Sequence, residues 1–389
     1  MINFTKLLGG TPGVSEMLKA VSRKKHSALY VACNASRPLV VFNVTRYCNL
    51  ECRHCYLKSR DKLIKGELSL AQIKKVLDSL GEMEIPVLLL SGGEPLAHKD
   101  IFTIIEYAKS KNIRVGLSTN GTLITKPAAC RLNALGVDYV GVSIDGKRQR
   151  HDYFRRMKGA YERSIRGIRN AQDAGLKAGV RFTITKLNAA DLPAVIDMCL
   201  KENIPRFCMY HLVYAGRGTA LAAEDIDNAQ RRQVVDFLIR RTQECNAQGK
   251  NIEILSVDNH ADGIYIYLYL KQKNPAKAKE VLRLLKFHGG CSAASKVVDV
   301  SPDGNVFPCQ FWHEDMLGSV KEEDFYRIWL NRSNRKLQKL RHKAQYLKGK
   351  CSRCRYQAYC GGCRVRAFTV YGDFWQEDPC CYLEEKEIG

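Results

Sequence analysis

The sequence predicts an α/β protein in which strands and helices alternate, followed by a cysteine-rich C-terminal domain. Three observations carry this prediction. Six short apolar runs recur in the first 213 residues, and amphipathic stretches with helical spacing separate them. Eight of the 16 cysteines lie in the last hundred residues. Strands that alternate with helices are expected to run parallel, joined by right-handed crossovers.

The apolar runs that we interpret as strands cover residues 39–44, 86–90, 113–117, 138–144, 178–185 and 206–213. Ser69 is a suitable N-cap for a first helix, and Asp100 precedes a second one. Further apolar helical faces lie at 165–171 and 192–199. Ligands of parallel sheets bind at the carboxyl ends of the strands, so the loops after these runs are the places to search for a site.

The loop after the first apolar run carries three closely spaced cysteines, Cys48, Cys52 and Cys55. Three thiolates on one tight loop can hold three irons of a cubane cluster, which leaves the fourth iron without a protein ligand. An open coordination position is typical of a catalytic metal site. The loop after the second run reads Ser91-Gly92-Gly93-Glu94-Pro95, in which the two glycines allow a ligand to approach the backbone closely.

These two motifs together resemble the signature of the radical S-adenosylmethionine (SAM) enzymes, with His54 where many members have Phe or Tyr. The resemblance implies a six-unit partial barrel and a 4Fe–4S cluster whose open iron chelates SAM. Reductive cleavage of SAM then gives a 5′-deoxyadenosyl radical. It also implies the residues that bind the cofactor, which are Gly92, Gly93 and Glu94 for the SAM amine, Asn120 near the ribose, and Ser143 for the carboxylate.

Arg155 follows the fourth predicted strand and is a natural bidentate partner for a carboxylate. Two interpretations remain open: it holds the SAM carboxylate, or it is a solvated surface arginine. Arg181, on the fifth strand, is a second candidate for the carboxylate, and Asn188, just after that strand, is a weaker one.

The C-terminal cysteines resemble the SPASM extension of radical SAM enzymes, which carries auxiliary 4Fe–4S clusters. Zinc is the rival interpretation, because paired C-x2-C spacings are typical of zinc ribbons. The resemblance implies one or two auxiliary clusters with interleaved ligands. One set would be Cys351, Cys354, Cys360 and Cys380, and the other Cys291, Cys309 and Cys363. Cys381 is the alternative to Cys380, and the second set has no evident fourth ligand.

We therefore expect four regions. They are an N-terminal arm at 1–36, flexible or used for docking, a radical SAM partial barrel at 37–214, a bridging helical region at 215–288 and a SPASM-type domain at 289–389. Within the bridging region a long helix is expected near 225–248. The alternating tyrosines at 265–269 fit either a strand or a helical face.

The formal net charge of +22 suggests an anionic ligand. Three kinds of ligand fit, namely nucleic acid, an acidic membrane or a polycarboxylate. No run approaches the ~18 apolar residues of a membrane helix, so no membrane span is expected. The N-terminus lacks a secretory pattern, which favours a cytoplasmic protein. In that reducing compartment the cysteines are expected to bind metal rather than form disulfides.

Several stretches resemble the haem-biosynthesis subgroup of radical SAM enzymes, which contains the didecarboxysirohaem deacetylases and the enzymes of d-type haem synthesis. The matching stretches are 37–45, 210–218, 258–263, 361–367 and 381–383. This resemblance implies a sirohaem-derived iron tetrapyrrole as substrate, with carboxylate side chains that are removed or modified. It also implies an electron donor such as flavodoxin or ferredoxin. His211 either ligates the substrate iron or is an ordinary structural histidine.

Two other function classes remain as alternatives. A peptide or protein maturase is one, because SPASM domains occur in such enzymes, although no N-terminal peptide-binding winged-helix pattern is evident. A non-catalytic RNA-binding or scaffold protein is the other. The combination of the open-iron motif with Gly-Gly-Glu-Pro argues against it, and the sequence has no aromatic pattern of an RNA-recognition motif. We therefore do not expect nucleic acid as a partner.

Overall fold

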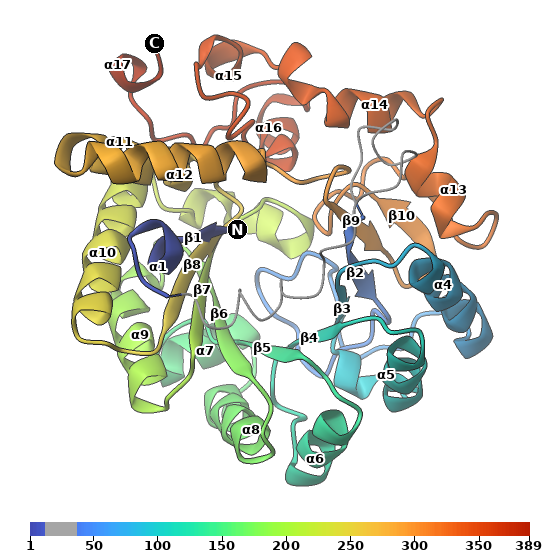
Figure 1. Cartoon of the computed structure of the whole chain (residues 1–389). Helices are drawn as coiled ribbons and strands as arrows, with labels where there is room; N and C mark the ends of the chain where they lie inside the picture. Colours follow the sequence, from blue (N-terminus) through green and yellow to red (C-terminus); the bar gives the residue numbers. More distant parts are fainter. Residues whose placement is uncertain (12–36) are drawn as a thin grey trace.

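A curved sheet of eleven strands forms the centre of the protein, seen in a computed structural model that describes residues 1–11 and 37–389. The six predicted strands are present and pair in parallel, in chain order. They are β2 (Leu39–Asn43), β3 (Leu88–Ser91), β4 (Val115–Thr119), β5 (Tyr139–Ser143), β6 (Ala178–Ile184) and β7 (Arg206–His211). Figure 1 shows them as an open arc with helices along its outer side.

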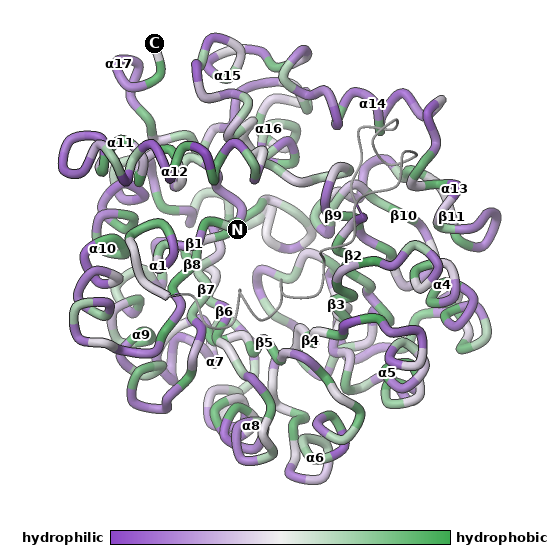
Figure 2. Tube along the Cα trace, in the orientation of Figure 1, coloured by the Kyte–Doolittle hydropathy of each residue, from purple (hydrophilic) through white to green (hydrophobic). Residues whose placement is uncertain are grey.

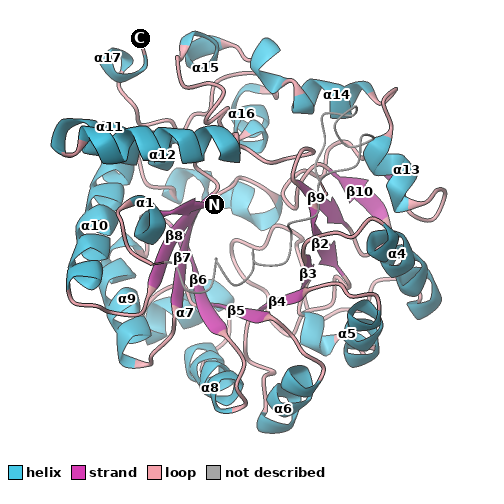
Figure 3. Cartoon of the chain, in the orientation of Figure 1, coloured by secondary structure: helices cyan, strands magenta, loops and turns pink. Residues whose placement is uncertain are grey.

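The helices between the strands cover the convex face of the arc (Figure 3). They are α4 (Leu70–Glu82), α5 (Ile101–Ser110), α6 (Lys126–Ala134), α7 (Arg148–Arg155), α8 (Ala160–Asp173) and α9 (Leu192–Lys201), with short 3-10 turns η1 (Pro95–Ala97) and η2 (Ala189–Asp191). Ser69 caps α4 as predicted, and with Gln72 it forms a capping box. Asp100 precedes α5, but its side chain makes no capping hydrogen bond.

One edge of the sheet contains the first residues of the chain. Strand β1 (Ile2–Asn3) pairs antiparallel with β8 (Glu253–Val257), and helix α1 (Phe4–Leu7) follows it. The side chain of Phe4 is fully buried. The prediction of a flexible or docking arm over 1–36 is therefore wrong for residues 2–7, because these apolar residues complete a sheet edge and part of the core. Residues 12–36 of that predicted arm lie outside the described residues.

The other edge of the sheet comes from the cysteine-rich region. Strand β9 (Val297–Val300) pairs in parallel with β2, and β10 (Asn305–Phe307) and β11 (Gly318–Ser319) continue antiparallel. A buried hydrogen bond of 2.7 Å from Asn43 Nδ2 to Asp299 Oδ1 joins β2 to β9. The expected separate domain beginning near residue 289 thus shares its sheet with the barrel, and its backbone covers the edge that β2 would otherwise expose.

The bridging region adds a strand that the sequence analysis did not predict. Strand β8 extends the parallel sheet beyond β7. Around it lie η3 (Gly216–Glu224), α10 (Asn228–Ala247), α11 (Ala261–Lys273) and α12 (Pro275–His288). The long helix expected near 225–248 is α10, which Asp227 caps. The tyrosines at 265–269 lie on α11, so the helical alternative for that stretch holds.

Residues 325–389 form short helices, most of which lie above the arc in Figure 1. They are α13 (Phe325–Leu330), α14 (Arg335–Arg341), η4 (Lys343–Gln345), α15 (Gly349–Arg353), α16 (Arg364–Tyr371) and α17 (Glu385–Ile388). Among residues 1–11 and 37–389, no helix combines the length and the apolar character needed to cross a membrane.

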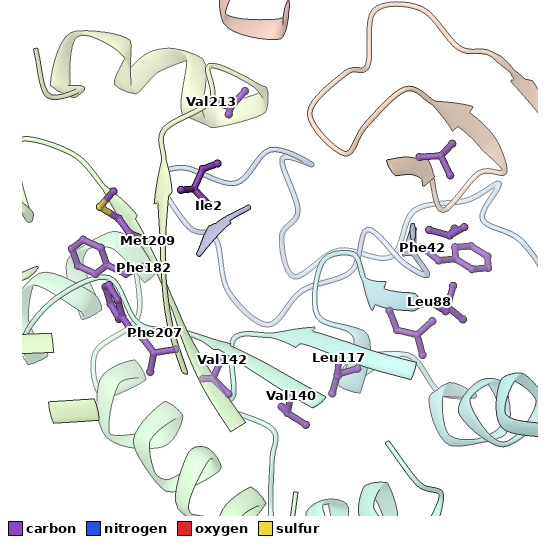
Figure 4. Close-up of a cluster of buried hydrophobic side chains, with 14 of the residues drawn as sticks. Ile2, Phe42, Leu88, Leu117, Val140, Val142, Phe182, Phe207, Met209 and Val213 are labelled. Carbon is purple, nitrogen blue, oxygen red and sulfur yellow. The ribbon is translucent and has the colours of Figure 1, made fainter. Parts of the chain in front are cut away.

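The main core lies between the sheet and its outer helices. Val140, Val142, Phe182 and Phe207 are fully buried there, and the rings of Phe182 and Phe207 pack 6.1 Å apart (Figure 4). Figure 2 shows hydrophobic residues along the strands and hydrophilic residues along much of the outer helices. A parallel sheet with covered faces requires such continuous apolar strands. This core supports the loops at the strand ends, where the candidate site lies.

Candidate active site

A cavity lies at the carboxyl ends of the parallel strands. Its walls come from the loops after β2, β3, β4 and β5, from β6 and β7, and from the segment that follows β10. Lining residues include Cys48, Cys52, Cys55, Gly92, Gly93, Asn120, Ser143, Arg155, Arg181, Tyr210, His211, Asp258 and Phe311. Motifs far apart in the sequence therefore meet at one place, as expected from the parallel topology.

The cysteine loop presents three thiols, each of which receives a hydrogen bond. The backbone N–H of Leu50 donates to Cys48 Sγ at 3.4 Å, and that of Ser59 donates to Cys55 Sγ at 3.3 Å. Arg155 Nη1 donates to Cys52 Sγ at 3.5 Å. Burial raises the pKa of the Cys48 thiol, so its thiolate needs a cation to remain charged. Donors around the sulfurs are the outer-shell support that metal-bound thiolates require.

Three thiols on one loop are the number of ligands that a cubane cluster with one open iron requires. In the described part of the chain, no group of three or more His, Cys, Asp or Glu side chains is arranged to hold one metal ion. The ligands of a cubane bind different irons, so their sulfurs do not converge on one point.

The two glycines of the second motif press against the cysteine loop. A Cβ atom on Gly93 would lie 2.0 Å from the carbonyl oxygen of Tyr47, and one on Gly92 would lie 2.5 Å from that of Thr45. Gly92 also has a φ of +131°, which a residue with a side chain rarely adopts. The backbone N–H of Gly93 donates to Thr45 at 2.7 Å. Only glycine allows these two loops to form one continuous cavity wall.

Glu94 has a different position from the one that the sequence analysis expected. Its side chain is fully buried and is not among the residues that line the cavity. Its carboxylate accepts hydrogen bonds from the Thr119 hydroxyl at 2.7 Å, the Asn120 N–H at 2.8 Å and the Leu96 N–H at 3.1 Å. Direct contact with the SAM amine is therefore not supported. The carboxylate instead ties the loop after β3 to the end of β4, because these donors satisfy both its oxygens.

Arg155 is neither a solvated surface residue nor a cation without a partner. It is buried, and its Nη2 lies 2.5 Å from Asp145 Oδ2 while its Nη1 reaches Cys52. Burial raises the pKa of Asp145, but Arg155, together with smaller contributions from its other neighbours, outweighs it and holds the pKa below its usual value. Burial lowers the pKa of His54 to about 4, so this neighbour of Asp145 is neutral at pH 7. The charge of Arg155 is thus shared between the Asp145 carboxylate and the Cys52 thiol.

The other predicted cofactor residues divide into two groups. Ser143 and Asn120 line the cavity, and the Asn120 amide donates to Asn49 Oδ1 at 2.9 Å. Asn188 is fully buried and bridges Thr185 to the backbone of Asp145, so it is structural. Arg181 lines the cavity, donates to the Ser118 hydroxyl and has no carboxylate partner among the described residues. It is the cavity-lining arginine whose charge remains available to a ligand.

The C-terminal cysteines form two neighbourhoods. Burial raises the pKa of Cys309 well above its usual value, and the nearby thiols of Cys291 and Cys363 add to the rise. Burial likewise raises the pKa of Cys360, with Cys381 and Cys351 as its neighbours. Cys351 lies on α15, and Cys354 is the residue that directly follows this helix. None of the described cysteines forms a disulfide.

Cys380 contacts groups other than the C-terminal thiols, which does not favour its expected role as a ligand. Its side chain is buried, with Sγ 3.4 Å from the Tyr214 hydroxyl and 3.7 Å from Asp225 Oδ2. Burial raises the pKa of Cys381 to about 12, and Cys351 is among the groups that add to this shift. The geometry therefore favours the alternative, in which Cys381 joins Cys351, Cys354 and Cys360. The chain turns here, because the Cys381 N–H donates to the Asp378 carbonyl at 3.0 Å, and the Cys380 side chain is directed to Tyr214.

A buried ion pair that the sequence analysis missed links the C-terminal region to the cavity. Arg366 Nε and Nη2 bind the two oxygens of Asp378 at 2.9 and 2.8 Å, and both residues are almost fully buried. Arg366 also donates to the carbonyls of Leu212 at 3.2 Å and Asp258 at 2.7 Å, both on the cavity wall. The pairing of Asp145 with Arg155 was not predicted either. The residues next to Arg366 and Asp145 in the sequence do not indicate which distant side chain each of them binds.

Comparisons with known proteins agree with this architecture. Residues 42–199 match the Radical SAM superfamily, and residues 291–355 match SPASM, described as an iron-sulfur cluster-binding domain. The chain is 43% identical to an Fe-coproporphyrin III synthase of Methanosarcina barkeri, over 100% of this chain and 99% of that protein. It is 40% identical to a pre-heme d1 synthase of Dinoroseobacter shibae, over 92% of this chain and 89% of that protein.

Among solved structures, SuiB of Streptococcus suis bound to S-adenosylmethionine has a similar fold. The TM-score is 0.73 at 18% sequence identity, over 95% of this chain and 87% of that one. At this identity the similarity concerns the fold alone. It places the barrel and the cysteine-rich region in the same arrangement.

Proposed function

The chain belongs to the radical SAM enzymes with a SPASM domain, and from this premise we propose that it removes acetate side chains from didecarboxysirohaem to give an iron coproporphyrin. The observation that carries this proposal is the end-to-end similarity to an Fe-coproporphyrin III synthase. The two domains imply 4Fe–4S clusters in this chain. Arg181 and the aromatic side chains of the cavity wall are compatible with a flat substrate that carries a carboxylate.

In this proposal Cys48, Cys52 and Cys55 hold the SAM-binding 4Fe–4S cluster, and the backbone at Gly92 and Gly93 receives the SAM amine. Asn120 lies near the ribose and Ser143 near the SAM carboxylate. When SAM and the reduced cluster are bound, they supply a 5′-deoxyadenosyl radical, with the electron coming from a cytoplasmic flavodoxin or ferredoxin.

Residues of the barrel stabilise the thiolates of the cysteine loop and exclude water from the cavity. The Arg155–Asp145 pair holds positive charge beside the Cys52 sulfur, which stabilises its thiolate. Tyr56 and Phe311 lie edge to face, with ring centroids 5.4 Å apart, and both line the cavity. Such apolar walls exclude the water that would quench a reactive intermediate.

Arg181 is the residue that we propose to bind a carboxylate on the rim of the macrocycle. Its guanidinium stacks over the ring of Tyr210 at 4.8 Å, so its plane is held in one orientation. A planar, preorganised guanidinium binds a carboxylate bidentately with little further loss of side-chain entropy. Clamping the rim would bring the reacting carbon within about 3–3.5 Å of the radical, the spacing that such reactions need.

In the C-terminal region we propose one auxiliary 4Fe–4S cluster held by Cys351, Cys354, Cys360 and Cys381, and a second near Cys291, Cys309 and Cys363. A set of four thiols completes the coordination of a cubane. The second set has three thiols, so a cluster there would keep one position open to another ligand.

A second reaction on the same substrate class is favoured by a specific observation, the similarity to a pre-heme d1 synthase. That alternative differs in the side-chain reaction and not in the cofactors. A peptide maturase is the remaining alternative. The similarity to SuiB concerns the fold and does not bear on the substrate.

The test is anaerobic reconstitution of the full chain with iron and sulfide, followed by incubation with SAM, a reductant and didecarboxysirohaem. Mass spectrometry should detect 5′-deoxyadenosine together with a tetrapyrrole that has lost two acetate groups. A variant with Cys48, Cys52 and Cys55 replaced by alanine is the control and should make neither product. Turnover of a cysteine- or tyrosine-containing peptide, with no response to the tetrapyrrole, would replace this proposal by the maturase alternative.

A further inference from the structure

An exposed loop leaves the cysteine motif shortly after its last thiol. It covers residues 57–66, which we call the basic loop, and residues 60–66 within it are exposed. Leu63 is 81% exposed and Ile64 is 38% exposed. No residue of the basic loop is among those that line the cavity. A partner can therefore bind this loop without entering the cavity.

The positive charge of the basic loop is concentrated. Four of its ten residues are cations and one is an anion, namely Lys58, Arg60, Lys62 and Lys65 against Asp61. Over the whole chain 62 of 389 residues are Lys or Arg, so cations are more than twice as frequent in the loop as on average. Within residues 1–11 and 37–389, none of the four cations forms an ion pair with a carboxylate. Their charge is therefore available to an acidic partner.

Hydrogen bonds join the base of the basic loop to the cysteine motif. The backbone N–H of Ser59 donates to Cys55 Sγ at 3.3 Å, and that of Cys48 donates to the Arg60 carbonyl at 3.1 Å. Arg217 Nη2 donates to the Ser59 carbonyl at 2.8 Å and fixes the same segment from the other side of the barrel. The exposed part of the loop is thus connected to a thiol of the motif through a single hydrogen bond.

The exposed end of the basic loop is apolar. Leu63 and Ile64 are adjacent, and Lys62 and Lys65 flank them in the chain. Single exposed apolar side chains are common on protein surfaces, whereas apolar groups enclosed by charged ones are typical of a contact surface. A partner that fits this loop offers an apolar patch with acidic side chains around it.

We propose that the basic loop is the docking surface for a flavodoxin that delivers the electron for SAM cleavage. This assignment deepens the proposed function, which leaves the electron donor as flavodoxin or ferredoxin. The apolar benzenoid edge of a flavin, exposed among acidic side chains, matches the pair Leu63 and Ile64 between lysines. An iron–sulfur carrier offers acidic groups without such an apolar edge. The charge of the loop fits both donors, and its apolar end selects the flavodoxin.

The small size of the loop suits a donor that must leave after each encounter. One electron passes in each encounter, so that the flavin hydroquinone becomes the semiquinone and the cluster held by the cysteine motif is reduced. Redox encounters of this kind use small, weak interfaces. Opposite charges speed the association of such partners, and salt screens the attraction. Binding to the basic loop should therefore weaken as the salt concentration rises.

The experiment uses the reconstituted full-length protein, kept anaerobic, with a flavodoxin as the probe and no tetrapyrrole. Calorimetric titration at low salt gives the Kd of the flavodoxin, and stopped-flow absorbance follows the reoxidation of its hydroquinone. Lys62→Glu combined with Lys65→Glu should raise the Kd and slow the reoxidation, each by about tenfold or more. The amount of 5′-deoxyadenosine formed with SAM and excess dithionite, which needs no docking, should change by less than about twofold.

Three further measurements make the result specific. Lys126→Glu combined with Lys250→Glu is the matched control, because it changes the net charge equally at exposed residues outside the basic loop. It should keep the wild-type Kd within about twofold. Leu63→Asp should weaken flavodoxin binding by about tenfold, since it places a carboxylate against the apolar edge. The same titrations with a ferredoxin should show a smaller effect of Leu63→Asp.

The outcomes that would overturn the proposal are distinct. An unchanged Kd in the Lys62/Lys65 variant, or an equal change in the Lys126/Lys250 variant, would show that the loop is not the docking surface. An equal loss of the dithionite-driven reaction would make the loop a support of the cysteine motif only. A stronger effect of Leu63→Asp with ferredoxin than with flavodoxin would overturn the choice of donor.

The proposed function is tested separately, because none of these measurements contains a tetrapyrrole. Flavodoxin binding that depends on the basic loop, in a protein that does not convert didecarboxysirohaem, would overturn the proposed function and leave the docking surface in place. A wild-type protein that binds no flavodoxin but converts the tetrapyrrole with dithionite would overturn the docking surface alone.

Discussion

Replacing Cys381 by alanine should remove iron from the protein, whereas replacing its neighbour Cys380 should not. Cys381 lies in one neighbourhood with Cys360 and Cys351, while the Cys380 sulfur is buried against the Tyr214 hydroxyl at 3.4 Å. A 4Fe–4S cluster that loses one of four thiolates loses up to about four irons per chain. Cys380→Ala removes one weak hydrogen bond and leaves a small void, which costs about 1 kcal/mol of stability.

The assay is the iron and sulfide content of the two single variants, reconstituted and desalted side by side, with electron paramagnetic resonance of the reduced proteins. Thermal unfolding of each variant shows whether a loss of iron merely follows a loss of structure. Cys381→Ala should be short of iron by up to about four atoms per chain relative to Cys380→Ala. The reverse result, with iron lost from Cys380→Ala and retained by Cys381→Ala, would refute the reasoning.

Two other predictions concern the barrel. Gly93→Ala places a methyl group 2.0 Å from the Tyr47 carbonyl oxygen, so SAM affinity should fall by about tenfold or more in equilibrium dialysis. Gly389→Ala is the control, because its added methyl group would lie 3.5 Å from the nearest atom, an ordinary contact, and unchanged SAM binding by Gly93→Ala would contradict the prediction. Burial lowers the pKa of His151 from 6.5 to about 3, and its Nδ1 accepts the N–H of Asp145 at 3.1 Å. Below pH 6.5 the unfolded chain therefore binds a proton at His151, whereas the folded chain does not. The free energy of unfolding should fall between pH 6.5 and 3 by up to about 1.4 kcal/mol per pH unit. Urea unfolding at pH 7.5 and 5.5 should show a smaller acid loss for His151→Gln, and an equal loss would refute the assignment of this sensitivity to His151.

Local sequence patterns were sufficient for the central strands and for the outer helices that begin at clear caps. The six apolar runs became β2 to β7, and Ser69 caps α4. Each of these features depends on residues within a few positions of one another. The family resemblance added the partial-barrel fold, which the comparisons confirm. The pairing of the first residues of the chain was missed, because their partner β8 is about 250 residues away, and β8 itself was missed although it also pairs with the nearer β7.

The candidate site shows the same division. Spacing along the chain identified the cysteine loop and the two glycines that line the cavity. It did not predict that Glu94 braces two loops or that Arg155 is paired with Asp145. A sequence reports which charged groups exist, whereas their partners depend on which strand ends meet in space.

By itself, the sequence of this protein determined the strand and helix order, the two cysteine-rich motifs and the family to which the chain belongs. Each of these depends on the spacing of residues that are close together in the sequence. Only the tertiary structure placed the Cys380 sulfur against Tyr214 and the Cys381 thiol beside Cys360, and only it paired Arg155 with Asp145. Two adjacent cysteines are equivalent in a spacing pattern, and an arginine in a sequence does not show which carboxylate it will bind. Both results depend on contacts between segments far apart in the chain, which come together only when the chain folds.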